Sequence, residues 1–184
     1  VRFAGIFANL MRAAARTGMG SVMASKGVKA LVVRGTGSVS VSKPRMFEEL
    51  VDDIEEQIKG HEQYWGRRRM GTTRILMMAN AAGFLPTRHY TEGTFEHAAE
   101  VSGERLAEEF NVKGRGCFAC TIPCSRVYVV KSGEHAGLYG EGPEYESQGS
   151  FTARTGNKSL ETALKANDMC NRLGLDILTT AESI

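Results

Sequence analysis

The sequence predicts a mainly α-helical domain of the α+β class, with a few N-terminal strands and a short β-ribbon behind a group of cysteines. Apolar residues recur at helical spacing in residues 44–60 and 159–173, and a glycine closes or follows each stretch. Two short runs rich in β-branched residues, 28–33 and 126–130, predict strands. With 184 residues, of which 42% are apolar, the chain can bury a core of its own.

The first 35 residues mix small residues and glycines around Arg12 and Arg16, ahead of the expected strand at 28–33. Backbone amides of a glycine-containing segment can approach a phosphate, and arginine side chains can hold a phosphate through two hydrogen bonds each. A tight turn that packs a short helix on the strand is the simpler alternative. The residues alone leave both interpretations open.

Residues 44–60 predict the longest helix. Pro44 suits a first helical turn, and Gly60 closes the pattern. The apolar side of this helix consists of Phe47, Leu50, Val51, Ile54 and Ile58. We expect that side to face the core and the acidic residues between to form a solvated face.

Three further helices are expected along the chain. One covers residues 72–82 and ends at Gly83, and another covers 95–110, where the Ser-Gly pair at 102–103 can interrupt it. The last covers 159–173, with Gly174 as its C-cap. Between these helices, the Gly-Arg-Gly sequence at 114–116 and the glycine-rich residues 131–142 predict loops on either side of the strand at 126–130.

Three of the four cysteines, Cys117, Cys120 and Cys124, form a C-x2-C-x3-C motif. This spacing provides three thiolates for an iron–sulfur cluster, whose last ligand can come from far along the sequence. It also suits zinc, with His135 as the fourth ligand of a zinc-stabilised binding or assembly module. A disulfide is the weaker alternative, because secreted frameworks usually spread an even set of cysteines along the chain. Spacing alone leaves zinc and iron–sulfur about even.

Charge and hydropathy exclude two classes of partner. The net charge of +2 provides no strong field for nucleic acid, and the one basic run, residues 67–69, is typical of a solvated surface. No stretch approaches a membrane span, and no signal peptide is visible. We therefore expect a cytoplasmic protein that binds neither nucleic acid nor membrane. The chain lacks an initiator methionine and reads as a piece of a longer protein.

Five motifs follow one another along nearly the whole chain. They are Arg12-Ala-Ala-Ala-Arg16, then Val22-Met-Ala-Ser-Lys26 leading into Leu31-Val-Val-Arg34, then Cys117-x2-Cys120-x3-Cys124, Gly142-Pro-Glu-Tyr-Glu146 and Asn171-Arg-Leu-Gly-Leu-Asp176. In this order they resemble the aldehyde ferredoxin oxidoreductase family. An ordered series is far more specific than any single motif, so it favours an iron–sulfur cluster over zinc.

The resemblance implies an oxidoreductase. Members of the family oxidise aldehydes to carboxylic acids at a tungsten- or molybdenum-bis-pterin centre and pass electrons through a [4Fe–4S] cluster to ferredoxin. An N-terminal β domain holds the metallopterin, and two largely helical domains follow it. Residues 1–40 then correspond to the C-terminal edge of the pterin domain, and 41–184 to most of the second domain. This piece alone is expected to be inactive, because it lacks most of the pterin domain and one cluster ligand.

The resemblance also implies roles for individual residues. Its three cluster ligands are Cys117, Cys120 and Cys124, and the fourth lies in the family's third domain. The pterin phosphates and the Mg²⁺ that bridges them are bound at Arg12, Ala13 and Arg16. The N–H groups of the pterin ring are bound at Asn171, Leu175 and Asp176. The active-site carboxylate, suited to proton transfer, is Glu146.

The chain departs from the family pattern at three places. Ala15 stands where the family commonly has glycine, and its methyl group crowds a backbone approach to the pterin. Asn171 replaces the first aspartate of the pterin motif and offers both a donor and an acceptor without charge. Lys165 and Asp168 replace a Glu-x-x-His pair that binds a metal between subunits in some members. A homodimer of this protein would therefore lack that bridging metal. Cys170 falls at a family position that is not a ligand, and we expect a buried thiol there.

Overall fold

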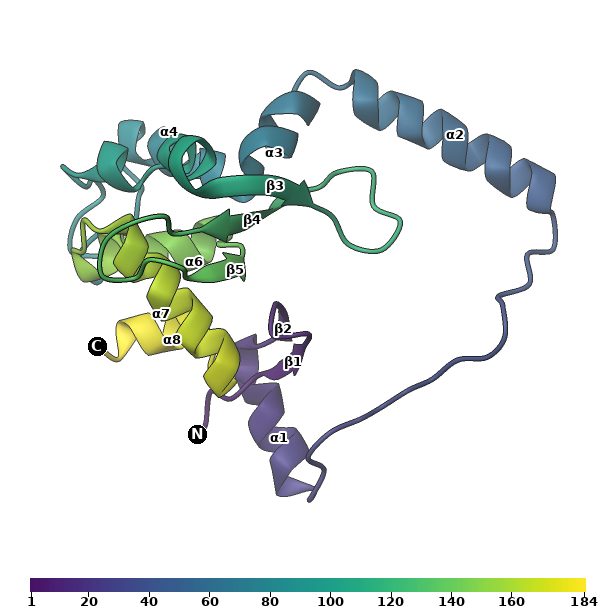
Figure 1. Cartoon of the computed structure of the whole chain (residues 1–184), viewed down its shortest axis with the longest axis horizontal. Coiled ribbons are helices and arrows are strands. Elements are labelled where there is room, and N and C mark those ends of the chain that lie inside the picture. The colour runs from purple at the N-terminus through teal and green to yellow at the C-terminus, as the bar shows by residue number, and fades with distance from the viewer.

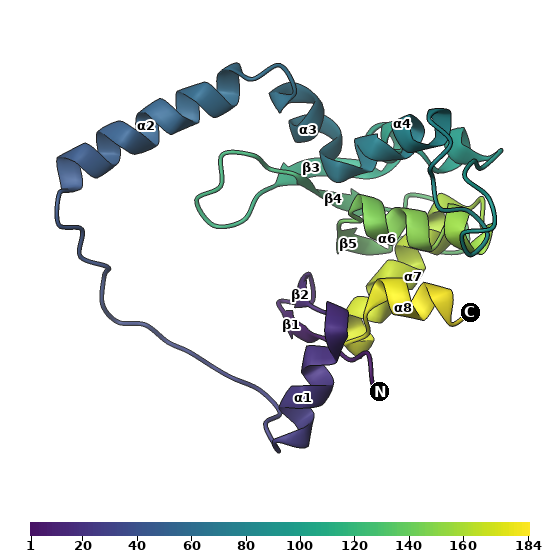
Figure 2. The same ribbon diagram turned by 180° about the vertical axis from the view of Figure 1, so that it is seen from behind.

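A computed structural model describes all 184 residues, and Figure 1 shows an N-terminal hairpin, a long connecting segment, a protruding helix and a compact body. The body holds a three-stranded sheet that lies between α3 and α4 on one side and α6 and α7 on the other (Figures 1 and 2). The prediction of a mainly helical α+β fold is confirmed. None of the helices combines the length and the apolarity that crossing a membrane requires.

The strands are all short. They are β1 (Ile6–Ala8), β2 (Arg12–Ala14), β3 (Asn111–Arg115), β4 (Ser125–Val129) and β5 (Tyr139–Glu141). The α-helices are α1 (Met19–Ser25), α2 (Pro44–Gly60), α3 (Tyr64–Met70), α4 (Ile75–Ala81), α5 (Gly103–Arg105), α6 (Tyr145–Ser150), α7 (Leu160–Leu173) and α8 (Ile177–Glu182). The remaining turns are the 3-10 segments η1 (Arg16–Gly18), η2 (Gly71–Arg74), η3 (Ala98–Val101) and η5 (Ala153–Thr155), and the π-turn η4 (Leu106–Phe110).

The N-terminal hairpin packs against the turn between α7 and α8. β1 and β2 pair antiparallel, with Phe7 opposite Ala13. The Gly5 N–H donates to the Gly174 carbonyl at 2.9 Å, and the Asp176 N–H donates to the Phe3 carbonyl at 3.0 Å. These backbone bonds join the two ends of the chain, so the arginine segment and the C-terminal motif lie side by side.

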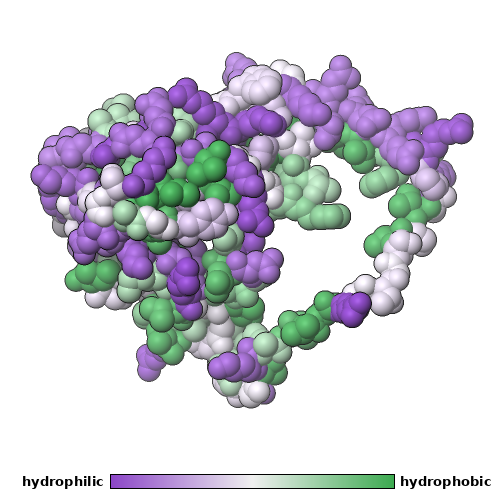
Figure 3. Space-filling model, viewed as in Figure 1, coloured by the Kyte–Doolittle hydropathy of each residue, from purple (hydrophilic) through white to green (hydrophobic).

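The strand expected at residues 28–33 is not formed, and this prediction was wrong. Residues 28–41 run as an extended segment without regular secondary structure between α1 and α2. A strand needs a neighbouring strand to pair its backbone groups, and no strand pairs with this segment. Leu31, Val32 and Val33 are therefore 81–89% exposed, and Figure 3 shows apolar side chains along the connecting segment.

The bounds predicted for α2 are confirmed, but its packing is not. The helix begins at Pro44 and ends at Gly60, and it projects away from the body in both views (Figures 1 and 2). The apolar side contacts no other helix along most of its length, so Phe47 and Leu50 are 53% and 55% exposed. The prediction that this side faces the core was therefore wrong. Near its C-terminal end, Glu55 accepts a hydrogen bond from the Thr121 hydroxyl at 3.0 Å.

The middle helices are shorter than the sequence predicts. The helix expected at 72–82 begins as the 3-10 turn η2 and becomes α4 at Ile75. The helix expected at 95–110 is broken into η3, α5 and η4. The break lies at Ser102, where its hydroxyl accepts a hydrogen bond from the Arg105 N–H at 3.1 Å and caps a new helix. The interruption expected at the Ser-Gly pair is thus confirmed.

The three-stranded sheet has the order β3-β4-β5, and both pairs are antiparallel. β4 confirms the strand predicted at 126–130, and with β5 it forms the ribbon expected behind the cysteines. β5 itself lies within residues 131–142, which were predicted to form a loop. β3 was not predicted, because the Gly-Arg-Gly sequence reads locally as a loop; in the structure Gly114 pairs with Arg126 of β4. The cysteines therefore lie in the connection between two paired strands.

The core of the body lies on both sides of this sheet. One buried cluster joins the sheet to α7 and η4, and its members are Leu106, Phe110, Tyr128, Val130, Leu160 and Leu164. α7 has the predicted extent, because Ser159 caps its first turn and Gly174, in the left-handed conformation, ends it. The N-terminal hairpin packs against the C-terminal end of α7, where Gly5 bonds to Gly174.

Candidate functional site

A cavity of about 450 Å³ lies between the N-terminal hairpin and the α7–α8 turn. Its walls contain all seven residues to which the sequence assigned pterin binding, namely Arg12, Ala13, Ala15, Arg16, Asn171, Leu175 and Asp176. These residues come from opposite ends of the chain, and the backbone bonds of the hairpin bring them together. The cavity also contains Glu141, Glu144, Ser147 and Asn167, which the sequence reasoning did not assign to it.

Arg16 and Asp176 meet at one side of the cavity. The Arg16 guanidinium lies 3.1 Å from Asp176 Oδ2, and the same oxygen accepts a hydrogen bond from the Thr179 N–H at 3.1 Å. Asp176 is thus the N-cap of α8, and its side chain is 3% exposed. These contacts use Oδ2, which leaves Oδ1 able to accept a hydrogen bond from a ligand.

Asn171 reaches the cavity from the last turn of α7, and Leu175 reaches it from just beyond the Gly174 cap. Asn167, one helical turn before Asn171, lines the same wall and is 3% exposed. Sequence reasoning missed Asn167. Residues four apart lie on the same face of a helix, so its spacing from Asn171 is the signal that could have found it. Two amides on one helical face can present both donors and acceptors to a ring edge.

Ala15 packs against the hairpin backbone. A methyl group added at Gly5 would lie 3.1 Å from the Ala15 Cβ and 2.8 Å from its Cα, closer than real side chains come. Gly5 must therefore be glycine for the hairpin to close on Ala15. The Ala15 side chain is half-buried in this contact and also lines the cavity.

The two glutamates of the Gly142–Glu146 motif lie in different environments. Glu146 is exposed on α6 and lies outside the cavity lining. Glu144, just before α6, lines the cavity, and its Oε2 accepts a hydrogen bond from the Thr72 hydroxyl at 2.5 Å. Sequence reasoning singled out Glu146, whereas the structure places the carboxylate of Glu144 at the cavity wall.

The three motif cysteines lie in the loop between β3 and β4, at the end of the sheet nearest α2 (Figure 1). All are free thiols; Cys117 and Cys120 are exposed and Cys124 is half-buried. Burial, followed by the nearby Glu144 and Cys117, raises the pKa of the Cys124 thiol. The Cys120 N–H donates to the Cys117 carbonyl at 3.1 Å in a tight turn. This donor set suits a soft metal or an iron–sulfur cluster, although the three side chains are not gathered around one point.

His135 is not brought to the cysteines. It lies in the loop after β4, whereas the cysteine loop lies before β4, so the two loops are at opposite ends of the strand. The structure gathers no group of three or more histidine, cysteine or acidic side chains that could hold a metal. Nothing in the geometry favours the zinc module. The expected buried thiol at Cys170 is confirmed, with 4% exposure.

A second cavity, of about 250 Å³, lies between the cysteine loop and the hairpin. Its lining includes Arg12 and Glu141, which also line the larger cavity, together with Arg115 and Cys117. Glu141, at the end of β5, forms ion pairs with both arginines; Oε1 faces Arg12, and Oε2 lies 3.1 Å from Arg115. The candidate pterin site and the cysteine loop therefore share a charged wall.

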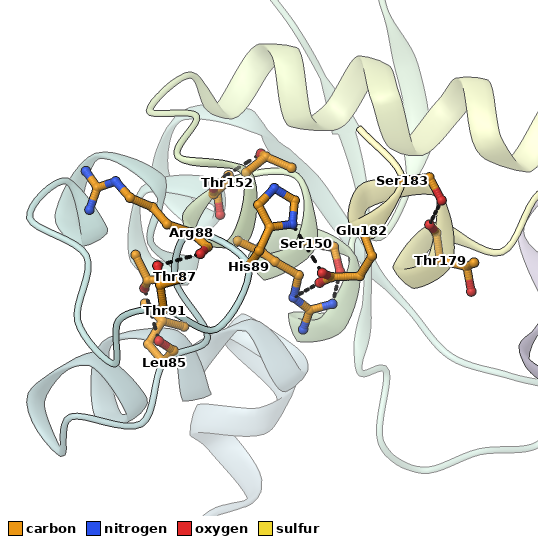
Figure 4. Close-up of polar contacts among 12 residues, drawn as sticks. Leu85, Thr87, Arg88, His89, Thr91, Ser150, Thr152, Thr179, Glu182 and Ser183 are labelled. Carbon is orange, nitrogen blue, oxygen red and sulfur yellow. Dashed lines mark hydrogen bonds and ion pairs between the residues drawn. The ribbon is translucent and has the colours of Figure 1, made fainter.

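A polar cluster holds α8, and hence Asp176, in place from the far side (Figure 4). Glu182, at the end of α8, forms an ion pair with the buried Arg154, whose Nε lies 3.0 Å from Oε1, and its Oε2 lies 3.2 Å from His89 Nδ1. His89 belongs to the run Arg88–Tyr90, whose three residues all have left-handed φ values between 44° and 66°. Backbone bonds from residues 88 and 89 to 153 and 154, of 3.0 and 2.9 Å, hold this loop. Sequence reasoning gave no signal for it.

Comparison with known proteins places these features in one family. A model described as aldehyde ferredoxin oxidoreductase, domains 2 and 3, matches residues 49–184, and the model of the N-terminal domain of that enzyme matches residues 1–35. A tungsten-containing aldehyde ferredoxin oxidoreductase of Pyrococcus abyssi is 39% identical over 181 residues, which are 97% of this chain and 29% of the relative. The enzyme of the same description from Thermococcus kodakarensis is 34% identical over 185 residues, covering all of this chain and 30% of the relative.

A more distant relative is described as an aliphatic sulfonate oxidoreductase, WOR-like subunit, from Pyrococcus furiosus. It is 25% identical over 189 residues, which cover 98% of this chain and 29% of the relative. The chain thus spans less than a third of the length of the curated relatives it matches.

Proposed function

The chain belongs to the aldehyde ferredoxin oxidoreductase family, and from that premise we propose that the whole protein oxidises small aldehydes to carboxylic acids at a tungsten- or molybdenum-bis-pterin centre. The observation that carries this proposal is the 450 Å³ cavity, whose walls bring together all seven residues expected to bind the cofactor. That residues from both ends of the chain line one cavity supports a single binding site there.

One end of the cavity suits the phosphates of the cofactor. Arg12 and Arg16 both line it, and their side chains are 39% and 63% exposed. Arg12 pairs with Glu141 and Arg16 with Asp176 through one terminal nitrogen each, so the remaining N–H groups can bind an anion. Guanidinium groups bind phosphate through paired, charge-assisted hydrogen bonds. We assign the phosphates and their bridging Mg²⁺ to this end, beside Ala13.

The residues of the α7–α8 turn, which meet Arg16 through Asp176, suit the pterin ring. Asp176 has Oδ1 free to accept from ring N–H groups, and Asn171 offers an amide that can donate or accept. Leu175 provides an apolar surface next to them. The carboxylate is fixed by Arg16 and the start of α8, so it binds the ring without reorganising.

We propose Cys117, Cys120 and Cys124 as three ligands of a [4Fe–4S] cluster, whose fourth thiolate comes from another part of the whole protein. Their exposed loop leaves room for that ligand to approach. When bound, the metallopterin supplies the two-electron oxidation, and the cluster passes the electrons singly to ferredoxin or a similar carrier. A cytoplasmic location agrees with this, because reducing conditions keep thiols free.

We propose a carboxylate of the Gly142–Glu146 segment as the proton acceptor of the reaction. The resemblance favours Glu146, and the position of Glu144 at the cavity wall supports that residue. Conversion of an aldehyde to a carboxylic acid consumes one water and releases two protons and two electrons, and such a carboxylate can take up one of those protons near the reacting carbon. The substrate pocket and any dimer contact involve segments outside this chain, and Lys165 and Asp168 do not offer the ligands of a bridging metal.

The metal content of the whole protein, purified without oxygen, tests the proposal. We expect iron, tungsten or molybdenum, the visible absorption of an iron–sulfur cluster, and reduction of ferredoxin in the presence of an aldehyde. The isolated 184-residue chain should show no aldehyde oxidation. A whole protein without iron and without a group-six metal would sink the proposal.

A further inference from the structure

The buried carboxylate of Glu141 separates two arginines that belong to different sites. Its side chain is 2% exposed, and it lies at the end of β5. Arg12 approaches one carboxylate oxygen from the hairpin strand β2, and Arg115 approaches the other, at 3.1 Å, from the end of β3. Each oxygen therefore has its own cationic partner.

This arrangement is not explained by stability alone. Burying a carboxylate costs free energy that its partners must offset, and replacing such a pair with apolar residues is often neutral or stabilising. Arg12 and Arg115 are also 39% and 48% exposed, so their pairing with Glu141 is partly screened by water. The two ion pairs with Glu141 instead fix the orientation of the Arg12 and Arg115 guanidinium groups.

The two arginines lead to the two cofactor sites. Arg12 lines the larger cavity, at the end suited to phosphate, and it also lines the smaller one. Arg115 lies two residues before Cys117, and both line the smaller cavity. Three residues line both cavities, namely Met11, Arg12 and Glu141.

Resting on the proposed function, we propose that Glu141 is a positioning residue that couples the pterin site to the cluster. It orients Arg12 toward the cofactor phosphates, and it holds Arg115 at the base of the cysteine loop while offsetting its charge. One carboxylate thereby links the binding of the metallopterin phosphates at Arg12 to the positive charge of Arg115 beside the cysteine loop.

The electrostatic consequence has a definite sign. A positive charge near a cluster stabilises the reduced form and raises its midpoint potential, and a negative charge lowers that potential. Glu141→Gln leaves Arg115 without its counter-ion, so the potential should rise. Arg115→Met removes the cation and leaves the carboxylate, so the potential should fall. The double variant should return toward the wild-type potential.

The tungsten or molybdenum content of each variant distinguishes the Arg12–Glu141 pair from the Arg115–Glu141 pair. Glu141→Gln frees Arg12, so the tungsten or molybdenum content should fall by about tenfold at limiting cofactor, a typical loss for an outer-shell partner. Arg115→Met leaves the Arg12–Glu141 pair in place, so its metallopterin content should stay near wild type. The double variant should combine a wild-type potential with low metallopterin content.

The experiment is a redox titration of the cluster, followed by electron paramagnetic resonance, on the anaerobically purified whole protein. Glu182→Gln is the control, because it removes a different carboxylate charge that pairs with an arginine, and Glu182 lines neither cavity. It should leave the cluster potential unchanged.

Three outcomes would overturn the coupling. They are potential shifts of the same direction in Glu141→Gln and Arg115→Met, an unchanged potential and metal content in Glu141→Gln, and an equal shift in the Glu182→Gln control. Each of these presupposes a wild-type protein loaded with iron and a group-six metal. A wild-type protein without them overturns the proposed function itself, and the coupling with it.

Discussion

Arg16 and Asp176 are 160 residues apart in the sequence, and the guanidinium lies 3.1 Å from the carboxylate. The contact joins the segment expected to bind phosphate to the segment expected to bind the pterin ring. Asp176 also caps α8, so one carboxylate contributes both to the helix start and to the cavity. These two contributions can be separated by experiment.

Asp176→Ala should destabilise the protein and also empty the cavity. Loss of an N-cap costs about 1 kcal/mol of the free energy of unfolding. Ser159→Ala removes the equivalent cap of α7, where the hydroxyl accepts from the Thr162 N–H at 3.2 Å, and Ser159 does not line the cavity. Denaturant unfolding should give similar losses for both variants. Only Asp176→Ala should lower the metallopterin content, and equal cofactor loss in both would show that Asp176 acts only through its helix.

Glu182→Gln should destabilise the body more than the loss of a surface ion pair does. Arg154 is 5% exposed and lies 3.0 Å from Glu182, so removing the carboxylate charge leaves a buried cation poorly compensated. We expect a loss of about 2 kcal/mol in the free energy of unfolding. Glu108→Gln is the control, because the Arg69–Glu108 pair is more than 60% exposed on both sides and should contribute about 0.5 kcal/mol or less. Equal losses would contradict the structure around α8.

Tyr128 should make the stability of the fold sensitive to alkaline pH. Burial raises the pKa of the Tyr128 phenol to about 12, and its hydroxyl donates to the Leu164 carbonyl at 3.2 Å. In the unfolded chain the phenol ionises near its ordinary pKa of about 10. The neutral form favours the folded state, so this contribution is complete below pH 10 and is lost as the pH rises toward 12.

The measurement is the free energy of unfolding of wild type and of Tyr128→Phe between pH 9 and pH 12, values that bracket this window. The phenylalanine variant cannot ionise at this position, so the difference between the two proteins isolates Tyr128 from other groups that titrate there. We expect the wild type to lose stability relative to the variant as the pH rises. Parallel pH profiles would mean that the phenol is accessible to water.

The bounds of the two longest helices were predictable, and the packing of their surroundings was not. Pro44, Gly60, Ser159 and Gly174 act through the backbone around them, so the bounds of α2 and α7 follow from the sequence. Whether an apolar side becomes buried depends on another element approaching it. No element covers most of the apolar side of α2 or residues 31–33, and both are exposed.

Some residues of the candidate site were also predictable from the sequence, and others were not. The residues proposed to bind the cofactor belong to recognisable motifs, and they line one cavity. Glu141 and Arg115 were missed because an ion pair between distant strands leaves no local pattern. Glu144 and Glu146 share one motif, and only the start of α6 decides which of them turns to the cavity.

The two glutamates give the last prediction. If the carboxylate at the cavity wall accepts the proton, Glu144→Gln should lower kcat of the whole enzyme by about 100-fold or more, the usual contribution of a general base. Glu146→Gln, on the exposed side of α6, should change kcat little. Both variants keep the side-chain shape, so each is the control of the other. Steady-state kinetics with an aldehyde at saturation, with the metal content measured on the same samples, distinguishes them. A large loss of kcat in Glu146→Gln alone would mean that α6 is oriented differently in the whole protein and that Glu146 accepts the proton.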